Sequence, residues 1–137
     1  MCKVGDIILV QNYNDNGIDL SRHSFVIISD EAGQIQGLEY DLMCNVMSSF
    51  KNVKHREQKL KYSGNYEVLY TDSIITDGGN GLDGYIKAEQ FYYFTKDTIE
   101  YEVIGSLEPE FFDSLIQFIE DLEIQTIDVL DNIKKND

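Results

Sequence analysis

The stretch EYEVIGSLEPEFFDSLIQFIEDL (residues 100–122) decides the fold class, because the spacing of its apolar residues changes half-way along. Ile99, Tyr101 and Val103 alternate with polar residues, which is the period-2 pattern of a strand that ends near Gly105. Beyond Pro109 the apolar residues recur every three or four positions, as in a helix with one buried stripe. That stripe consists of Phe111, Leu115, Phe118 and Leu122, with Phe112, Ile116 and Ile119 beside it.

The sequence also predicts where this helix begins. Glu108 is suited to the N-cap position and Pro109 to the first helical position, where its missing N–H costs nothing. Acidic residues in the first turn are favoured by the helix dipole. After the helix, a second apolar run predicts either an extension of it or another turn, and consists of Ile124, Ile127, Leu130 and Ile133.

The residues before this stretch predict strands. Residues 4–11, 24–29, 65–70, 84–95 and 99–105 are rich in β-branched and aromatic residues, and residues 36–49 read as one long strand or two bent ones. Asn14–Gly17 is a turn cluster followed by a polar loop to Ser21, and TDGGNGLDG (residues 76–84) is a glycine-rich loop. Five or six short strands capped by one helix indicate a mainly β, α+β fold, a small closed or half-open barrel.

Length and composition favour one cytoplasmic domain. A chain of 137 residues is long enough for one substantial core. It has no apolar run long enough to span a membrane and no signal-peptide pattern, and Cys2 and Cys44 lack metal or redox spacing. The net charge of −14 is uneven, because the last 41 residues carry −10, whereas residues 51–61 hold five of the eleven basic residues. An acidic surface repels nucleic acid, but a basic segment of this kind could contact it; it could equally be a solvated connection between strands.

Residue patterns alone identify no catalytic set. The GGNG segment lacks the Lys-Ser/Thr of a phosphate-binding loop, and no serine nucleophile elbow is present. With only two histidines and no acid at ligand spacing, a metal site is not expected. The carboxylates are numerous, but nothing singles out a glycosidase pair. Patterns therefore lead to a β-rich domain with one polarised face.

Four segments, in order, resemble the PemK/MazF family of toxin ribonucleases from bacterial toxin–antitoxin pairs. VGDIILVQ resembles the family's first strand, and RHSFVIIS lies where the family has Arg-Pro followed by an apolar strand. CNVMSSFKN lies where it has a strand ending in Thr-Ser. The most specific piece is GYIKAEQFYYFTKDTIEYEVIGSLEPEFFDSLIQFIEDL, which is similar to the family's closing block.

The resemblance implies an SH3-like barrel of the CcdB/PemK/MazF toxin type over residues 1–123, with residues 124–137 as an acidic extension. It also implies a homodimer that cleaves single-stranded RNA (mRNA) without a metal or cofactor, uses the ribose 2'-hydroxyl as nucleophile, and is silenced by an antitoxin protein. His23 stands at the family's arginine, Ser24 at its proline, and Ser48 at its threonine. The catalytic candidates are thus His23, Arg22 and Ser48; the RNA-binding candidates are Ser49, Lys51, Lys54, Arg56 and Asp19.

Each candidate also has a structural interpretation. His23 could be a hydrogen-bonded histidine at a strand start, Arg22 a member of a surface ion pair, and Ser48 and Ser49 strand-end residues. The aromatic run Phe91 to Phe94 suits a core better than a base-stacking platform. Two other functions stay open: a CcdB-type toxin that binds a protein target without nuclease activity, which the acidic C-terminal third favours, and a family member that has lost catalysis and acts as a binding module.

Overall fold

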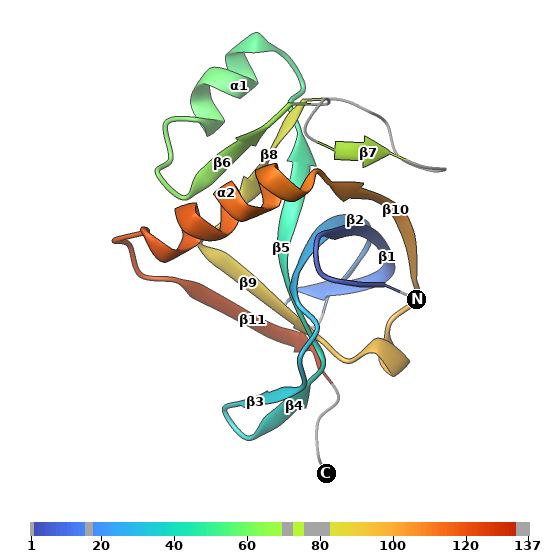
Figure 1. Cartoon of the computed structure of the whole chain (residues 1–137). Coiled ribbons are helices and arrows are strands. Elements are labelled where there is room, and N and C mark those ends of the chain that lie inside the picture. Colours follow the sequence, from blue (N-terminus) through green and yellow to red (C-terminus); the bar gives the residue numbers. More distant parts are fainter. Residues whose placement is uncertain (1, 16–17, 70–72, 76–82, 134–137) are drawn as a thin grey trace.

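A computed structural model describes residues 2–15, 18–69, 73–75 and 83–133, and gives only the backbone at 15, 18–21 and 73–75. The protein is mainly β, with a strongly curled, half-barrel sheet and two helices (Figure 1). The elements are β1 (Asp6–Asp15), β2 (Ile18–Ser29), β3 (Gly33–Ile35), β4 (Leu38–Tyr40), β5 (Leu42–Ser49), α1 (Val53–Lys59), β6 (Asn65–Val68), β7 (Ser73–Ile75), β8 (Gly84–Lys87), β9 (Gln90–Phe94), the 3-10 turn η2 (Lys96–Thr98), β10 (Tyr101–Leu107), α2 (Pro109–Glu120) and β11 (Ile127–Asn132).

Within the described residues, one sheet holds all the strands except the β3–β4 hairpin. Its order is β11-β9-β5-β2-β1-β10-β7, and β8 and β6 continue from β5 on a side branch. The two long strands β1 and β2 curl so far that β1 returns to the other end of the sheet, beside β11. There the backbone N–H of Asn14 donates to Oδ1 of Asn132 (2.9 Å), and Nδ2 of Asn132 donates back to the carbonyl of Asn14 (3.0 Å).

The curled sheet buries an inner core on one face and two further hydrophobic clusters on the other. The inner core contains both cysteines, which are free thiols, as the lack of redox spacing predicts. It also contains Tyr92 and Phe94, whereas Phe91 and Tyr93 face the other way and are buried near the β3–β4 hairpin. All four are at most 8% exposed, so this aromatic run is core rather than a stacking platform. The outer core lies beneath α2 and consists of Ile7, Leu9, Val26, Val68, Ile86, Ala88, Ile104, Leu107 and Leu115.

Helix α2 confirms the prediction from its apolar spacing. Glu108 is the N-cap residue, Pro109 occupies the first helical position, and Leu115 of the predicted stripe is fully buried. Phe111 and Phe118 pack on Tyr66 of β6, with ring centroids 5.5 and 4.6 Å away. Strand β10 overlaps the predicted alternating segment but begins at Tyr101 and ends at Leu107, and it buries Ile104 rather than Val103, which is 37% exposed. The predicted strand over residues 36–49 is the pair β4 and β5.

One prediction for the connections is wrong. The polar residues 12–15 and 18–21 extend β1 and β2 rather than forming a long loop, and pair across the hairpin from Tyr13 and Ser21 onward. Residues 53–59 do connect two strands, β5 and β6, without burying a residue, but they form helix α1, which the sequence pattern did not predict. Asn52 caps this helix: its side chain accepts a hydrogen bond from the N–H of His55 (2.8 Å). The glycine-rich residues 76–82 lie outside the described part of the chain.

The prediction for the segment after α2 is also wrong, because this segment neither extends the helix nor forms another turn. Residues 127–132 form β11, which runs parallel to β9 and starts with a bond from the N–H of Ile127 to the carbonyl of Glu89 (2.8 Å). Ile127 and Val129 have the β-branched side chains and the alternation that suit a strand. Acidic residues beyond Glu120 are unfavourable at the C-terminal end of a helix, so α2 stops there.

Neither α1 nor α2, nor any other helical segment among the described residues, has the length and apolar content needed to cross a membrane.

Candidate functional site

The antiparallel register brings two of the three catalytic candidates to one face of the sheet. His23 pairs with Val10, whose side chain belongs to the inner core, so His23 faces inward too. Ser24 pairs with Met47 at the end of the β2–β5 ladder, and Ser48 follows one residue beyond this last pair. Ser48 also lies two residues beyond the inner-core residue Val46, which puts it on the same face by strand alternation.

The imidazole of His23 sits at the rim of the inner core. Its ring centroid lies 4.7 Å from that of Tyr13, at an interplanar angle of 50°, and Tyr13 itself is only 3% exposed. Nδ1 of His23 is buried and makes no hydrogen bond with any of the described residues. Buried polar atoms are nearly always paired, so the unpaired imidazole nitrogen of His23 marks this side chain as a candidate functional group.

Ser48 is held by an unusually close approach of β8 to β5. It pairs with Tyr85, and Ser49 pairs with Gly84. A Cβ atom at position 84 would overlap the carbonyl oxygen of Ser48, so glycine is required for the two backbones to lie this close. The half-buried Ser48 therefore sits at a rigid junction where β5 leaves β2 and turns to β8.

The other two residues at this step point away from His23. Arg22 is exposed and alternates with His23, so its side chain leaves β2 on the opposite face. Ser49 alternates with Ser48 in the same way on β5. Strand alternation thus puts His23 and Ser48 on one face of the sheet, and Arg22 and Ser49 on the other. Asp19 belongs to β2 and pairs with Asn14 of β1; its side chain lies outside the described part of the structure.

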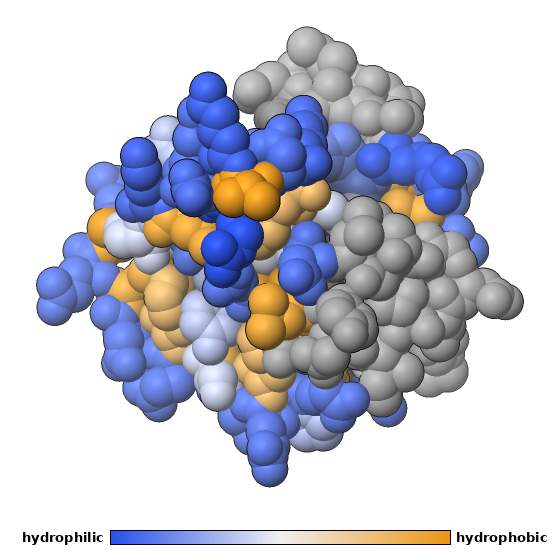
Figure 2. All heavy atoms as spheres, turned by 90° about the horizontal axis from the view of Figure 1, so that it is seen from above, coloured by the Kyte–Doolittle hydropathy of each residue, from blue (hydrophilic) through white to orange (hydrophobic). Residues whose placement is uncertain are grey.

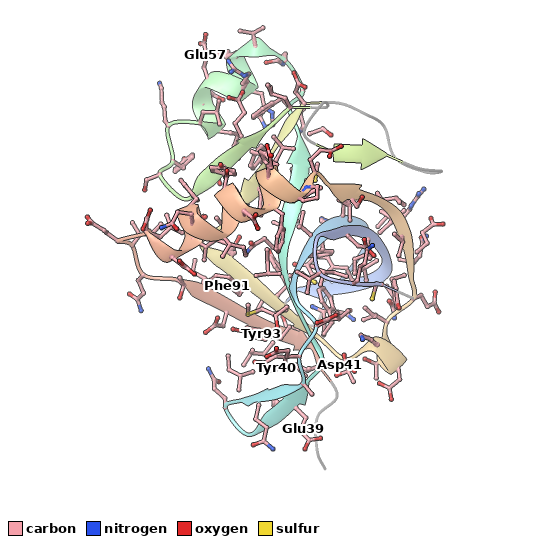
Figure 3. The ribbon with its side chains drawn as sticks, viewed as in Figure 1. Glu39, Tyr40, Asp41, Glu57, Phe91 and Tyr93 are labelled. Atoms are coloured by element: carbon pink, nitrogen blue, oxygen red, sulfur yellow. The ribbon has the colours of Figure 1, made fainter. Side chains whose placement is uncertain are left out.

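The basic RNA-binding candidates follow β5 directly, on and before α1. Lys51 and Lys54 are exposed, α1 has no buried residue, and Glu57 lies at the outer side of the helix (Figure 3). Seen from above, the described surface mixes hydrophilic and hydrophobic residues (Figure 2). Arg56 is less available, because its Nε donates to Oε2 of Glu67 on β6 (2.8 Å) and the two residues form an ion pair.

Sequence reasoning missed an aromatic cluster between Ser48 and α1. The ring of Phe50 stacks on that of Tyr85 (centroids 5.4 Å apart, 28°), and His55 lies 6.2 Å from each of them. Nδ1 of His55 accepts the N–H of Lys51 (3.0 Å), which orients the imidazole. Tyr85 is remote in sequence from the other two, so no local pattern points to this cluster; only the pairing of β5 with β8 assembles it.

Among the described residues no group of three or more His, Cys, Asp or Glu side chains is arranged to hold a metal ion. A comparison with known protein families and with curated proteins finds no match for this chain.

Proposed function

We propose that the protein is a PemK/MazF-like toxin of a type II toxin–antitoxin pair, a metal-independent endoribonuclease that cleaves single-stranded RNA. One observation carries the proposal: the unpaired, buried Nδ1 of His23 lies on the same face as Ser48, at the step before a buried strand. The family resemblance assigns its catalytic arginine and threonine to these same two positions.

The fold is compatible with the proposed family. The four resembling segments fall on β1, on the second half of β2, on the end of β5, and on β8 through α2. A curled sheet covered by a C-terminal helix is what an SH3-like toxin barrel requires. The proposal also includes a homodimer and an antitoxin protein as partners.

The chemistry needs a proton acceptor, a donor to the phosphate and nearby positive charge. In the proposed reaction His23 takes the proton of the ribose 2'-hydroxyl, and the freed oxygen attacks the adjacent phosphorus. The bond from phosphorus to the 5'-oxygen breaks, and that oxygen takes a proton from water. Ser48 donates its hydroxyl proton in a hydrogen bond to a non-bridging oxygen, and Lys51 and Lys54 offset the phosphate charge. The products are a 2',3'-cyclic phosphate end and a 5'-hydroxyl end.

A cleavage assay on a long single-stranded RNA in the presence of a chelator tests the proposal. The wild type should produce discrete fragments whose 5'-hydroxyl ends accept phosphate from a kinase without prior dephosphorylation. His23→Ala should slow cleavage by about 10²- to 10⁴-fold, the usual contribution of a general base. Ser48→Ala should slow it by about 10²-fold, as for loss of one donor to a developing oxyanion.

The matched control is Ser24→Ala, which removes a hydroxyl next to His23 but on the opposite face, and should cleave as fast as the wild type. All variants are purified identically, so a contaminating nuclease would cut equally in every sample. Thermal unfolding of each variant separates loss of chemistry from loss of fold. The absence of cuts by the wild type at high protein concentration, or equal cutting by His23→Ala, would refute the nuclease and favour a protein-binding toxin of the CcdB type.

A further inference from the structure

A second surface, which includes none of the catalytic candidates, lies at the C-terminal end of α2. A hollow of about 380 Å³ opens there, lined by Ser63, Phe118, Asp121, Leu122, Glu123 and Ile124. We call it the α2-end groove. Phe118 and Leu122 are half-buried members of the outer core, so the floor of the groove is apolar, whereas Asp121 and Glu123 form an acidic rim.

The apolar surface continues past the groove. Ile124 of the groove lining is 40% exposed, and Tyr62, the residue before the lining residue Ser63, is 64% exposed. Ile127 is 50% exposed at the start of β11. Its N–H binds the carbonyl of Glu89, whose carboxylate packs against Gly64, so Ile127 lies beside the same corner. Clustered exposed apolar side chains around a hollow are typical of a surface that binds a partner.

The acidic rim works against helix stability. Glu120, Asp121 and Glu123 lie at the C-terminal end of α2, where the helix dipole is negative and cations are favoured, yet the last turn has no basic residue. Oδ1 of Asp121 accepts a bond from Nε2 of Gln117 (3.0 Å), but among the described residues no Lys or Arg forms an ion pair with these three carboxylates. The lysines of the neighbouring connection, Lys59 and Lys61, line a separate hollow with Tyr62.

We propose that the α2-end groove binds a cationic amphipathic segment of a partner protein. An apolar anchor of the segment fills the space over Phe118, Leu122 and Ile124, and its Lys or Arg side chains pair with Asp121 and Glu123. Charge complementarity selects this occupant: nucleic acids and acidic peptides are repelled by the rim, whereas a cationic segment neutralises the carboxylates that the helix dipole disfavours. The binding uses no residue of the proposed nuclease site.

The probe is an 18-residue helix-forming peptide of leucine and lysine with one central tryptophan. Because the protein contains no tryptophan, the fluorescence reports on the peptide alone. Titration of the full chain should give saturable binding with a blue shift of the emission, which signals burial of the tryptophan. A peptide with glutamate in place of every lysine should not bind.

Matched pairs of variants separate the groove from the general negative charge. Asp121→Asn with Glu123→Gln should weaken binding by about 5- to 10-fold more than Glu100→Gln with Glu102→Gln, which removes the same charge from exposed sites around β10. Ile124→Ser should abolish the blue shift, whereas Val103→Ser, at a similarly exposed residue (37%), should preserve it.

His23→Ala should bind the peptide like the wild type, so this test and the cleavage assay fail independently. Equal weakening by both acidic pairs would show that the attraction is only to the overall charge and would overturn the proposal. So would an unshifted emission maximum with the wild type.

Discussion

Replacing Asn132 by alanine should loosen the contact between β11 and the end of β1. The side chain of Asn132 is 6% exposed and makes two reciprocal hydrogen bonds, of 2.9 and 3.0 Å, to the backbone of Asn14. Alanine leaves both the N–H and the carbonyl of Asn14 without these partners. A part-buried backbone group left unpaired costs about 1–3 kcal/mol, so we expect a loss of about 2–4 kcal/mol in the free energy of unfolding.

Thermal unfolding followed by circular dichroism measures this loss. With an unfolding entropy of about 2.1 cal/mol/K per residue, 1 kcal/mol corresponds to about 3–4 °C for a chain of this length, so Tm should fall by about 7–14 °C. Hydrogen exchange should locate the effect, because the amide of Asn14 should exchange at least about tenfold faster in the variant.

Asn12 provides the matched control. It also bridges two backbone groups, donating to the carbonyl of Thr98 (3.2 Å) and accepting from the N–H of Glu100 (2.8 Å), but at an exposed site where water replaces the lost partners. Asn12→Ala should therefore cost only about 0.5–1.5 kcal/mol. If Asn132→Ala lowers the free energy of unfolding no more than Asn12→Ala does, burial does not strengthen the Asn14–Asn132 hydrogen bonds. Our account of how β11 is held against the end of β1 would then be wrong.

Two further predictions follow from close contacts. Gly84→Ala should lower the free energy of unfolding by more than about 2 kcal/mol, because its Cβ would overlap the backbone carbonyl of Ser48. The control is Gly37→Ala, at a φ of 81° but with nothing within 4 Å, which should lower it by about 1–2 kcal/mol. Equal losses in chemical denaturation would refute the overlap argument. Tyr93 should titrate well above free tyrosine, because burial and then the charge and hydrogen bond of Asp128 (3.1 Å) raise its pKa. Because the pKa of Tyr93 is higher in the folded state than in the unfolded state, the protonated phenol contributes to folding stability. This contribution is fully present below the unfolded pKa, near 10, and is lost as the pH rises from there through the folded pKa. The absorbance titration of the wild type minus Tyr93→Phe measures the shift, and Asp128→Asn should reduce it; a difference curve centred near pH 10 would contradict this reasoning.

Tyr93 belongs to a contact that no single segment of the sequence specifies. Its ring meets the edge of Tyr40, which is in the β3–β4 hairpin, with centroids 4.8 Å apart (Figure 3), and its hydroxyl reaches Asp128 on β11. Three elements from different parts of the chain thus converge on one phenol. The sequence predicted a buried aromatic run here, but not the partners.

The sequence predicted α2 but predicted neither helix α1 nor strand β11, and one physical difference explains both outcomes. Helix α2 carries its own signals, a proline at its start and a buried stripe, and these act locally. Helix α1 is too short and too polar to show a buried stripe, and it depends on the cap at Asn52. Strand β11 is stabilised by β9 and by Asn14, which are remote in sequence, so its alternation over a few residues resembles the end of a helix.

The candidate site could be predicted only in part, because a sequence alignment does not show which face a residue occupies. In a strand, neighbouring side chains point to opposite faces, so a shift of one residue changes the chemistry completely. Arg22 and His23 are consecutive in the segment that resembles the family's Arg-Pro step, yet only His23 lies on the same sheet face as Ser48. A small movement of Arg22 cannot replace His23, since reaching the inner face would require flipping the strand and exposing Phe25, which is fully buried. If this protein cleaves RNA from the face of Ser48, it does so with a histidine where the family has an arginine, and proton transfer rather than fixed positive charge must then dominate at that position.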